Sequence, residues 1–401
     1  MSRPRPTGFP AAAVLPDHGG LSIAGIPELI WQAMSRTAET TPLGRAVAPA
    51  SATRVVLLVI DGLGFRAFER MAAKGALPVL RGLTERGAFF PITSVFPSTT
   101  VTALTSLATG LPPIAHGMLG YRLYLREISS IADMIRLSPI TEEGRSTSED
   151  LDVDRLFRLP TFCGRFAEEG IRSHVLLPRA IVGSGLSRVL YRGCTNIEPT
   201  SGLADMCVQA RRILAEETQP TFLTLYWPGL DTVAHVRGPA SEAYRAEAAA
   251  IDGILGRELV DHAKETLLVV TSDHGMVTME PSDYLELDEL GPVTEALARL
   301  PVGEPRATYL HFEDDVRPGT KAPESLRDGL LRLCREQVVS SGLLGDGDAH
   351  PETLQRIGDE LIVSTGSAGL YHPYPGAPRL RGMHGGLTDE EMLVPLIATP
   401  L

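Results

Sequence analysis

The chain has 401 residues, of which 43% are hydrophobic and 21% charged, which is typical of a soluble globular protein with two or three domains, or with one large α/β domain carrying insertions. Its formal net charge of -12 argues against a surface for nucleic acid polymers, which is normally basic. The four cysteines, Cys163, Cys194, Cys207 and Cys334, form no C-x-x-C pair and no disulfide framework. With neither a signal peptide nor a long apolar run in the sequence, we expect a cytoplasmic protein that does not enter a membrane.

The first elements predicted along the chain are one helix and one buried strand. Residues 1–50 contain an irregular leader and a helix, roughly Ile26 to Ala38. The run Val55–Ile60 is apolar at every position and ends in Asp61-Gly62. A continuous apolar run, rather than an alternating one, indicates a strand buried on both faces, as in a parallel sheet flanked by helices.

The middle of the chain repeats this pattern after a less regular excursion at residues 121–200. Two further apolar strands, Phe222–Tyr226 and Thr266–Thr271, are separated by a helix from Ser241 to Leu259. Strands that alternate with helices predict an α/β fold with a doubly wound, mostly parallel central sheet flanked by helices.

The C-terminal third has a different texture. It contains a strand-like run Ala307–Phe312, a predicted helix Ser325–Gln337 and a strand-like Glu360–Val363, before the apolar run Met392–Ile397. We therefore predict a catalytic core of residues 1–277 and 380–401, with residues 278–379 inserted as a smaller α/β subdomain.

Three carboxylates follow the predicted buried strands. Asp61 and Asp273 each come directly after a strand, and Asp231 follows another by a few residues. Ligands of open α/β sheets bind at the carboxyl ends of the strands, so these acids are expected to share one edge. Taken singly, each has a plainer interpretation as a helix cap or turn former. Together they would repel one another unless a cation lay between them.

Histidines accompany these acids. His235 stands four residues after Asp231, a spacing that places both on one helix face, although such a pair is often only a solvated surface. His274 follows Asp273, and His384 lies in the glycine-rich segment Gly382–Gly386. Carboxylates mixed with imidazoles suit zinc or manganese better than calcium.

A segment rich in hydroxyls precedes and enters a predicted helix at residues 96–110. Pro97 fixes the chain before the helix, Thr99 and Thr100 fall near its start, and Gly110 ends it. A hydroxyl at a helix N-terminus meets the positive end of the helix dipole, which favours a bound phosphate and an alkoxide. The competing interpretation is ordinary N-capping by Ser98 or Thr99.

As a set, these segments resemble the alkaline phosphatase superfamily, and most of all its nucleotide pyrophosphatase/phosphodiesterase branch. The resemblance spans residues 55 to 397, and its segments occur in the order of the family. They are VVLLVIDG (55–62), FPSTTVTALTSLATG (96–110), LPPIAHG (111–117), the D-x-x-x-H pair (231–235), TSDHGM (271–276) and GMHGG (382–386).

The resemblance implies a specific distribution of roles. Asp61, Asp273 and His274 would hold one metal ion, with Thr100 as its fourth ligand and as the nucleophile. The second ion would be held by Asp231, His235 and His384. Thr99, one position earlier, remains the alternative nucleophile. The cofactors implied are two divalent ions, Zn²⁺ first and Mn²⁺ second.

One position departs from the branch. Where the branch has an asparagine that donates to the phosphoryl oxygen, this chain has Tyr121, followed by Arg122. We predict both as substrate-binding residues, because a tyrosine hydroxyl can donate and an arginine can pair with a phosphate oxygen. The extra charge of a phosphomonoester would suit the arginine.

The sequence thus predicts a metal-dependent phosphoric ester hydrolase of the phosphodiesterase or nucleotide pyrophosphatase kind, acting on a small-molecule phosphate ester or a nucleotide. Two alternatives stay open: a phosphomonoesterase or phosphonate hydrolase of the same superfamily, and a non-catalytic metal- or ligand-binding protein on the same fold. The sequence does not predict an oligomeric state.

Overall fold

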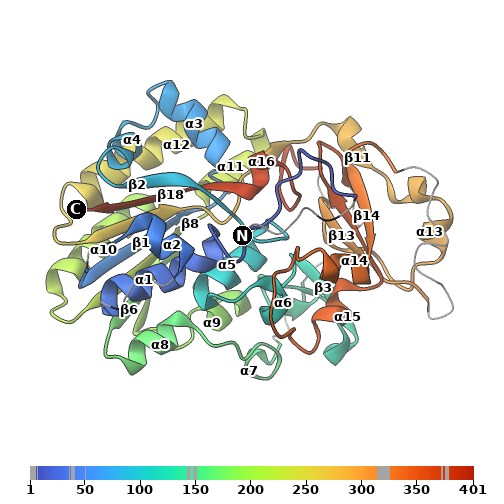
Figure 1. The fold of residues 1–401 in the computed structure, drawn as a ribbon, viewed down its shortest axis with the longest axis horizontal. Coiled ribbons are helices and arrows are strands. Elements are labelled where there is room, and N and C mark those ends of the chain that lie inside the picture. The colour runs from blue at the N-terminus through green and yellow to red at the C-terminus, as the bar shows by residue number, and fades with distance from the viewer. Residues whose placement is uncertain are drawn as a thin grey trace.

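The computed structural model consists of two lobes, each built on a seven-stranded sheet, which lie side by side in Figure 1. It describes residues 6, 8–35, 37, 41–49, 51–141, 146–147, 151–313, 326–371, 374 and 379–401. No helix within these ranges is long and apolar enough to cross a membrane.

The first sheet confirms the predicted α/β class. Its strand order is β2-β18-β9-β1-β8-β6-β7. β18 runs antiparallel to both of its neighbours, and the other pairs are parallel. The strands are β1 (Arg54–Ile60), β2 (Ala88–Thr93), β6 (Arg172–Pro178), β7 (Asn196–Thr200), β8 (Thr221–Trp227), β9 (Leu267–Thr271) and β18 (Leu393–Pro400).

The alternating side chains of β1 enter two separate cores, one on each face of the sheet. Val55, Leu57 and Val59 pack with one set of helices, while the side chains between them pack with another. The first set includes α1 (Ile26–Ser35), α5 (Thr100–Thr109) and α8 (Phe162–Glu168), and the second includes α3 (Phe65–Ala73), α10 (Leu203–Glu216) and α12 (Glu242–Leu255). Each buried aliphatic side chain contributes roughly 1.5–3 kcal/mol, so burial on both faces explains why this strand is apolar throughout.

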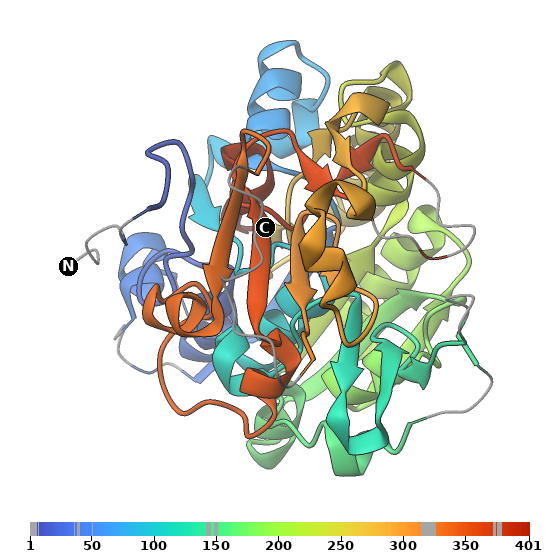
Figure 2. The ribbon, with the colours of Figure 1, turned by 90° about the vertical axis from the view of Figure 1, so that its right-hand side faces the viewer.

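The second sheet is antiparallel throughout and draws strands from two distant parts of the chain. Its order is β14-β15-β13-β12-β3-β4-β5. Figure 2 looks onto this lobe, where teal and orange strands belong to one layer. The strands are β3 (Arg122–Leu125), β4 (Ser130–Asp133), β5 (Ser138–Pro139), β12 (Val302–Glu304), β13 (Ala307–Leu310), β14 (Leu330–Cys334) and β15 (Glu360–Ser364).

This sheet bears on the predicted insertion at residues 278–379. β3, β4 and β5 join it through a single pairing of Gly303 with Arg122, although the prediction assigned their residues to the core. The excursion after residue 121 and the C-terminal insertion therefore build one layer together. The boundaries at 278 and 379 stay a prediction.

The predicted elements and the observed ones differ most in this lobe. Residues Ser325–Gln337 were expected to form one helix, but β14 and the short helix α14 (Arg335–Ser340) occupy the part that the structure describes, and Ser325 lies outside it. Leu331 and Leu333 pair with residues of β15, so cross-strand pairing overrides a pattern that is compatible with a helix. The predicted helix Ser241–Leu259 is α12, followed by a π-helical turn at Gly256–Val260.

The remaining elements are short. The helices are α2 (Pro42–Val47), α4 (Pro78–Thr84), α6 (Pro113–His116), α7 (Val153–Leu156), α9 (Gly185–Leu190), α11 (Gly229–Arg237), α13 (Pro292–Glu295), α15 (Thr353–Ile357) and α16 (Asp389–Met392). Two small sheets pair β10 (Val277–Thr278) with β17 (Gly382–Met383), and β11 (Tyr284–Leu285) with β16 (Gly369–Leu370). α1 begins as predicted and is described to Ser35, with Ala38 outside the described residues.

Candidate active site

The three predicted carboxylates meet at the carboxyl edge of the first sheet. β1 lies between β9 and β8, so Asp61 and Asp273 leave neighbouring strands side by side. Asp231 comes from helix α11, which directly follows β8. Gly62 permits this convergence: its φ is +77°, and a Cβ there would lie 3.0 Å from the Cα of Asp231.

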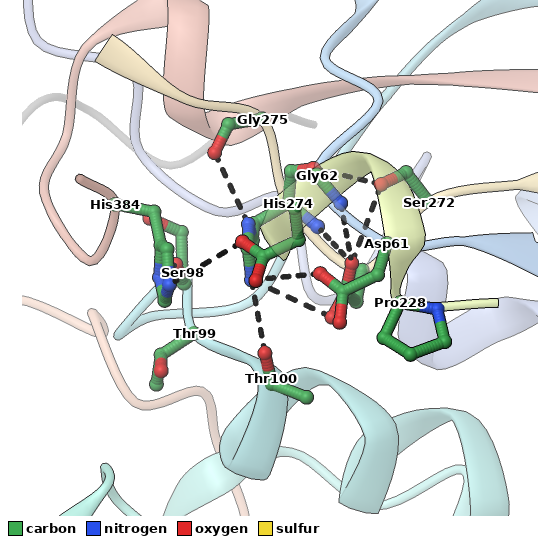
Figure 3. Close-up of polar contacts among 12 residues, drawn as sticks. Asp61, Gly62, Ser98, Thr99, Thr100, Pro228, Ser272, His274, Gly275 and His384 are labelled. Carbon is green, nitrogen blue, oxygen red and sulfur yellow. Dashed lines mark hydrogen bonds and ion pairs between the residues drawn. The ribbon is translucent and has the colours of Figure 1, made fainter. Parts of the chain in front are cut away.

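Asp61, Asp273 and His274 form the first group, and all three are buried. The Nε2 atom of His274 lies 3.4 Å from Oδ1 of Asp61 and 3.5 Å from Oδ2 of Asp273. The hydroxyl oxygen of Thr100 lies 3.2 Å from the same Nε2 atom, and a dashed line marks this contact in Figure 3. One nucleophile candidate and three ligand candidates therefore surround a single point.

Asp231, His235 and His384 form the second group. Oδ1 of Asp231 lies 3.3 Å from Nε2 of His235 and 4.0 Å from Nε2 of His384. Within each group, one ligand atom per residue lies within 4.8 Å of the others. The rings of His274 and His384 stack with their centroids 3.7 Å apart, so the two groups are adjacent.

Backbone carbonyls orient all three histidine rings. Nδ1 of His274 bonds to the carbonyl of Gly275, Nδ1 of His235 to that of Gly382, and Nδ1 of His384 to that of Ser98. A carbonyl only accepts, so each Nδ1 is the donor, and Nε2 is the ring nitrogen left to bind a metal ion. This outer-shell arrangement is characteristic of histidines that bind metal ions.

The electrostatics of the site fit divalent cations. Oδ1 of Asp61, Oδ1 of Asp231 and Oδ2 of Asp273 are buried without a hydrogen-bond partner among the described residues. Burial and the neighbouring Asp273 and Asp231 raise the pKa of Asp61 well above its usual range. Carboxylate oxygens and Nε2 atoms that converge in this way are stabilised by a divalent cation between them.

The start of helix α5 separates the roles of its hydroxyls. Thr99 occupies the N-cap position, but no side chain caps the helix. The Thr99 hydroxyl instead donates to Oε1 of Glu304 at 2.6 Å, and the Ser98 hydroxyl donates to the carbonyl of Gly386 at 2.9 Å. The capping interpretation is therefore wrong. Of the two threonines, only Thr100 turns its hydroxyl toward His274 (Figure 3).

Tyr121 and Arg122 are directed toward the second sheet. The Tyr121 hydroxyl donates to Asp133 at 3.2 Å, while its backbone N–H donates to Oε1 of Glu304 at 2.9 Å. The guanidinium of Arg122 lies 3.8 Å from the ring centre of Tyr374. The backbone of Tyr121 is thus linked to Thr99 through Glu304. That the side chains of Tyr121 and Arg122 contact the substrate remains a prediction.

Two buried residues of the site were absent from the sequence prediction. The Tyr226 hydroxyl donates to Oδ2 of Asp61 and leaves Oδ1 for another partner. Glu304 reaches the site from β12 in the second lobe. Tyr226 lies at the end of a predicted strand next to the acids, which is a weak signal. Glu304 has no sequence signal, because it arrives through the pairing of distant strands.

The fold and the two adjacent acid–histidine groups match the expectation of an alkaline phosphatase-like hydrolase. The profile of the family described as type I phosphodiesterase/nucleotide pyrophosphatase matches residues 55–315, and the chain belongs to this family. It is accordingly a phosphoric ester hydrolase, as predicted, and the non-catalytic alternative is set aside. A search of curated proteins found no match.

The solved structures with similar folds include two kinds of hydrolase. Murine ectonucleotide pyrophosphatase/phosphodiesterase 5 is 16% identical, with a TM-score of 0.69 over 87% of this chain and 88% of that one. Phosphonoacetate hydrolase from Sinorhizobium meliloti 1021, in complex with phosphonoformate, is 22% identical, with a TM-score of 0.64 over 87% and 90% of the two chains. At this level of identity the similarity confirms the fold.

Proposed function

We propose that this protein hydrolyses small-molecule phosphate esters, phosphodiesters or nucleotides first among them, with Thr100 as nucleophile and two divalent ions, Zn²⁺ before Mn²⁺, as cofactors. The observation that carries the proposal is the hydroxyl of Thr100, 3.2 Å from Nε2 of His274 at the meeting point of two buried carboxylates. Asp61, Asp273 and His274 would hold one ion, and Asp231, His235 and His384 the other.

The chain itself supplies orientation and a favourable field for the reaction. Thr100 is the first residue of α5, where the positive end of the helix dipole favours a phosphate and a developing alkoxide. In the first step the Thr100 oxygen gives up its proton and bonds to phosphorus while the bond from phosphorus to the ester oxygen breaks, and the departing oxygen takes up a proton. In the second step a water oxygen bonds to phosphorus, the bond to Thr100 breaks and the Thr100 oxygen regains a proton. Two bound ions would supply the positive charge that stabilises the attacking and the leaving oxygens.

Two solved relatives inform the substrate class. Murine ectonucleotide pyrophosphatase/phosphodiesterase 5 is described with AMP in an inactive threonine-to-alanine variant, which is consistent with a threonine nucleophile and a nucleotide substrate here. Phosphonoacetate hydrolase is described with phosphonoformate and with phosphonoacetate, so phosphonate hydrolysis is the second candidate. The shared chemistry is a tetrahedral phosphorus that carries anionic oxygens.

The first prediction concerns Thr100. We expect Thr100→Ala to lower kcat on bis(p-nitrophenyl) phosphate and p-nitrophenyl phosphate by ~10³-fold or more, because it removes the group that bonds to phosphorus. Thr99→Ala is the matched control: it should retain turnover well above that of Thr100→Ala, since its hydroxyl is turned to Glu304. Full activity in Thr100→Ala would refute the proposal, and a reversed ranking would move the nucleophile to Thr99.

A further inference from the structure

The turn between β12 and β13 carries two buried charged residues from the second lobe into the site of the first. Glu304 ends β12, and Arg306 precedes β13. Arg306 is fully buried, and Glu304 is only 6% exposed. Burying charged side chains is costly unless each is paired in a specific geometry, so the contacts of this hairpin tip require an explanation.

Glu304 contacts the nucleophile segment. Its Oε1 atom accepts the Thr99 hydroxyl at 2.6 Å and the Tyr121 backbone N–H at 2.9 Å. Thr99 directly precedes Thr100, so a restraint on the Thr99 side chain also limits movement of the first turn of α5. Through this one carboxylate oxygen, the second lobe is hydrogen-bonded both to the residue that precedes Thr100 and to Tyr121.

Arg306 contacts the loop that carries His384. Its guanidinium binds both carboxylate oxygens of Glu391, with Nη2 2.8 Å from Oε2, and donates as well to the carbonyls of Gly366 and Ser367. Glu391 in turn accepts the backbone N–H of Gly386 at 2.8 Å. The pair is bidentate, which fixes direction as well as distance.

The two contacted segments lie side by side. Ser98 pairs with Gly385 as an isolated antiparallel bridge, and the Ser98 hydroxyl donates to the Gly386 carbonyl. The Ser98 carbonyl accepts Nδ1 of His384 at 3.1 Å. Gly385 has a φ of +117°, and a Cβ there would lie 3.3 Å from the Cβ of Glu304, so the hairpin tip packs directly on this junction.

We propose that Glu304 and Arg306 are positioning residues with separate tasks: Glu304 aligns Thr100 through Thr99, and Arg306 holds the metal ligand His384 through Glu391 and Gly386. This inference rests on the proposed function. An apolar turn could join the lobes without burying charge, but it would fix neither segment in direction. The second lobe is thereby part of the catalytic geometry.

The Glu304 task predicts a change in kcat alone. In Glu304→Met, which keeps the volume but removes the acceptor, kcat should fall ~10- to 100-fold with little change in KM or metal content, because misplacement of a reacting group slows the chemical step. Glu304→Gln should restore kcat to near the wild-type value, since an amide oxygen accepts the same two hydrogen bonds. Thr99→Val should resemble Glu304→Met, and the double variant should be no worse than either single one.

The Arg306 task predicts weaker metal binding. Arg306→Lys, which keeps the charge but loses the fork, should weaken one of the two metal sites ~10- to 100-fold in chelator competition, the usual effect of losing an outer-shell partner. Should that variant fail to fold, Arg306→Met combined with Glu391→Leu replaces the pair with apolar groups and releases Gly386 in the same way. Arg332→Met is the matched control, because Arg332 pairs with Glu360 within the second sheet away from the site.

The outcomes separate this inference from the proposed function. Metal retention is measured without substrate, so the Arg306 task is tested even if Thr100→Ala proves fully active. Folded Glu304 and Arg306 variants with wild-type kcat and wild-type metal affinity would overturn the inference. Parallel losses of kcat, metal affinity and melting temperature in both, matched by Arg332→Met, would also overturn it, because they would indicate a purely structural role.

Discussion

The two sheets of this protein differ in how directly the sequence reveals them. The first is mostly parallel and covered by helices on both faces, and its central strands β1 and β9 are apolar runs closely followed by Asp61 and Asp273. The second is antiparallel, and its strands come from residues 122–139 and 302–364. Three candidate ligands, Asp61, Asp273 and His274, follow strands of the first sheet. The second sheet contributes Glu304 at the end of β12, next to Arg306, and these two residues contact Thr99 and Glu391. Ligand residues that follow apolar strands can be predicted from the sequence, whereas contacts that depend on the pairing of distant strands cannot.

The largest effect that sharpens this comparison is expected at Asp61. We predict that Asp61→Asn lowers kcat by ~10³-fold or more, because a two-metal site loses a charged ligand. In metal-free protein the same change should raise the free energy of unfolding by about 1–2 kcal/mol, since it removes a buried charge beside two other acids. Chemical denaturation with and without metal measures how Asp61→Asn changes the free energy of unfolding in each state.

The pH dependence of that stability gain has a definite sign. The pKa of Asp61 is raised in the folded state by burial and by Asp273 and Asp231. A raised pKa means that the folded protein favours the protonated acid. The destabilisation caused by ionised Asp61 is therefore complete above that raised pKa, shrinks as the pH falls below it and is gone below the unfolded value near 3.8. The difference in unfolding free energy between metal-free Asp61→Asn and metal-free wild type should therefore narrow on acidification. A gap that widens would contradict the account. Asp252→Asn is the control, because Asp252 accepts N–H groups of α4 away from the site and should leave metal binding unchanged.

An intermediate effect is expected from the core of the second sheet. Leu361 is fully buried on β15 and pairs with Tyr309 and Leu333. Leu361→Ala should cost about 2–5 kcal/mol of unfolding free energy through lost burial and a residual cavity. Metal content in the folded protein should not change, because the ligand candidates belong to the first lobe. A loss of bound metal at full folding would show that the second sheet supports the site more broadly than through the hairpin tip.

The smallest predicted effect concerns His116, which the sequence places among the family segments without a metal role. It is fully buried, its Nδ1 accepts the N–H of Met118, and its Nε2 lies 3.1 Å from the Ser106 hydroxyl. Burial lowers the pKa of His116 from 6.5 to about 3. The unfolded chain therefore takes up the proton first, and stability is lost as the pH falls from about 6.5 toward 3. His116→Gln should flatten this acid loss by about 1 kcal/mol or more in urea titrations at several pH values, and an unchanged slope would argue against it.

Much of the fold and of the site could be predicted because the information was local. A sheet edge with candidate metal ligands is predicted from a few neighbouring residues: the apolar run Val55–Ile60 followed by Asp61, and the adjacent pair Asp273 and His274. The strand at Leu330–Cys334 could not be recognised, since its leucines fit a helix until β15 pairs with them. Glu304 could not be found either, because only the tertiary structure brings it to Thr99. The roles of the three hydroxyls at residues 98–100 could be distinguished only from their hydrogen-bond partners in the structure.

The most direct test of the central claim is to identify the residue that carries the phosphoryl group during turnover. We would quench the metal-loaded protein with acid while it hydrolyses p-nitrophenyl phosphate and map the modified peptide by mass spectrometry. We expect a phosphoryl group on Thr100, because its hydroxyl contacts the same Nε2 atom of His274 that Asp61 and Asp273 approach. A phosphoryl group on Thr99, or product formation with no modified residue at any time, would contradict this expectation.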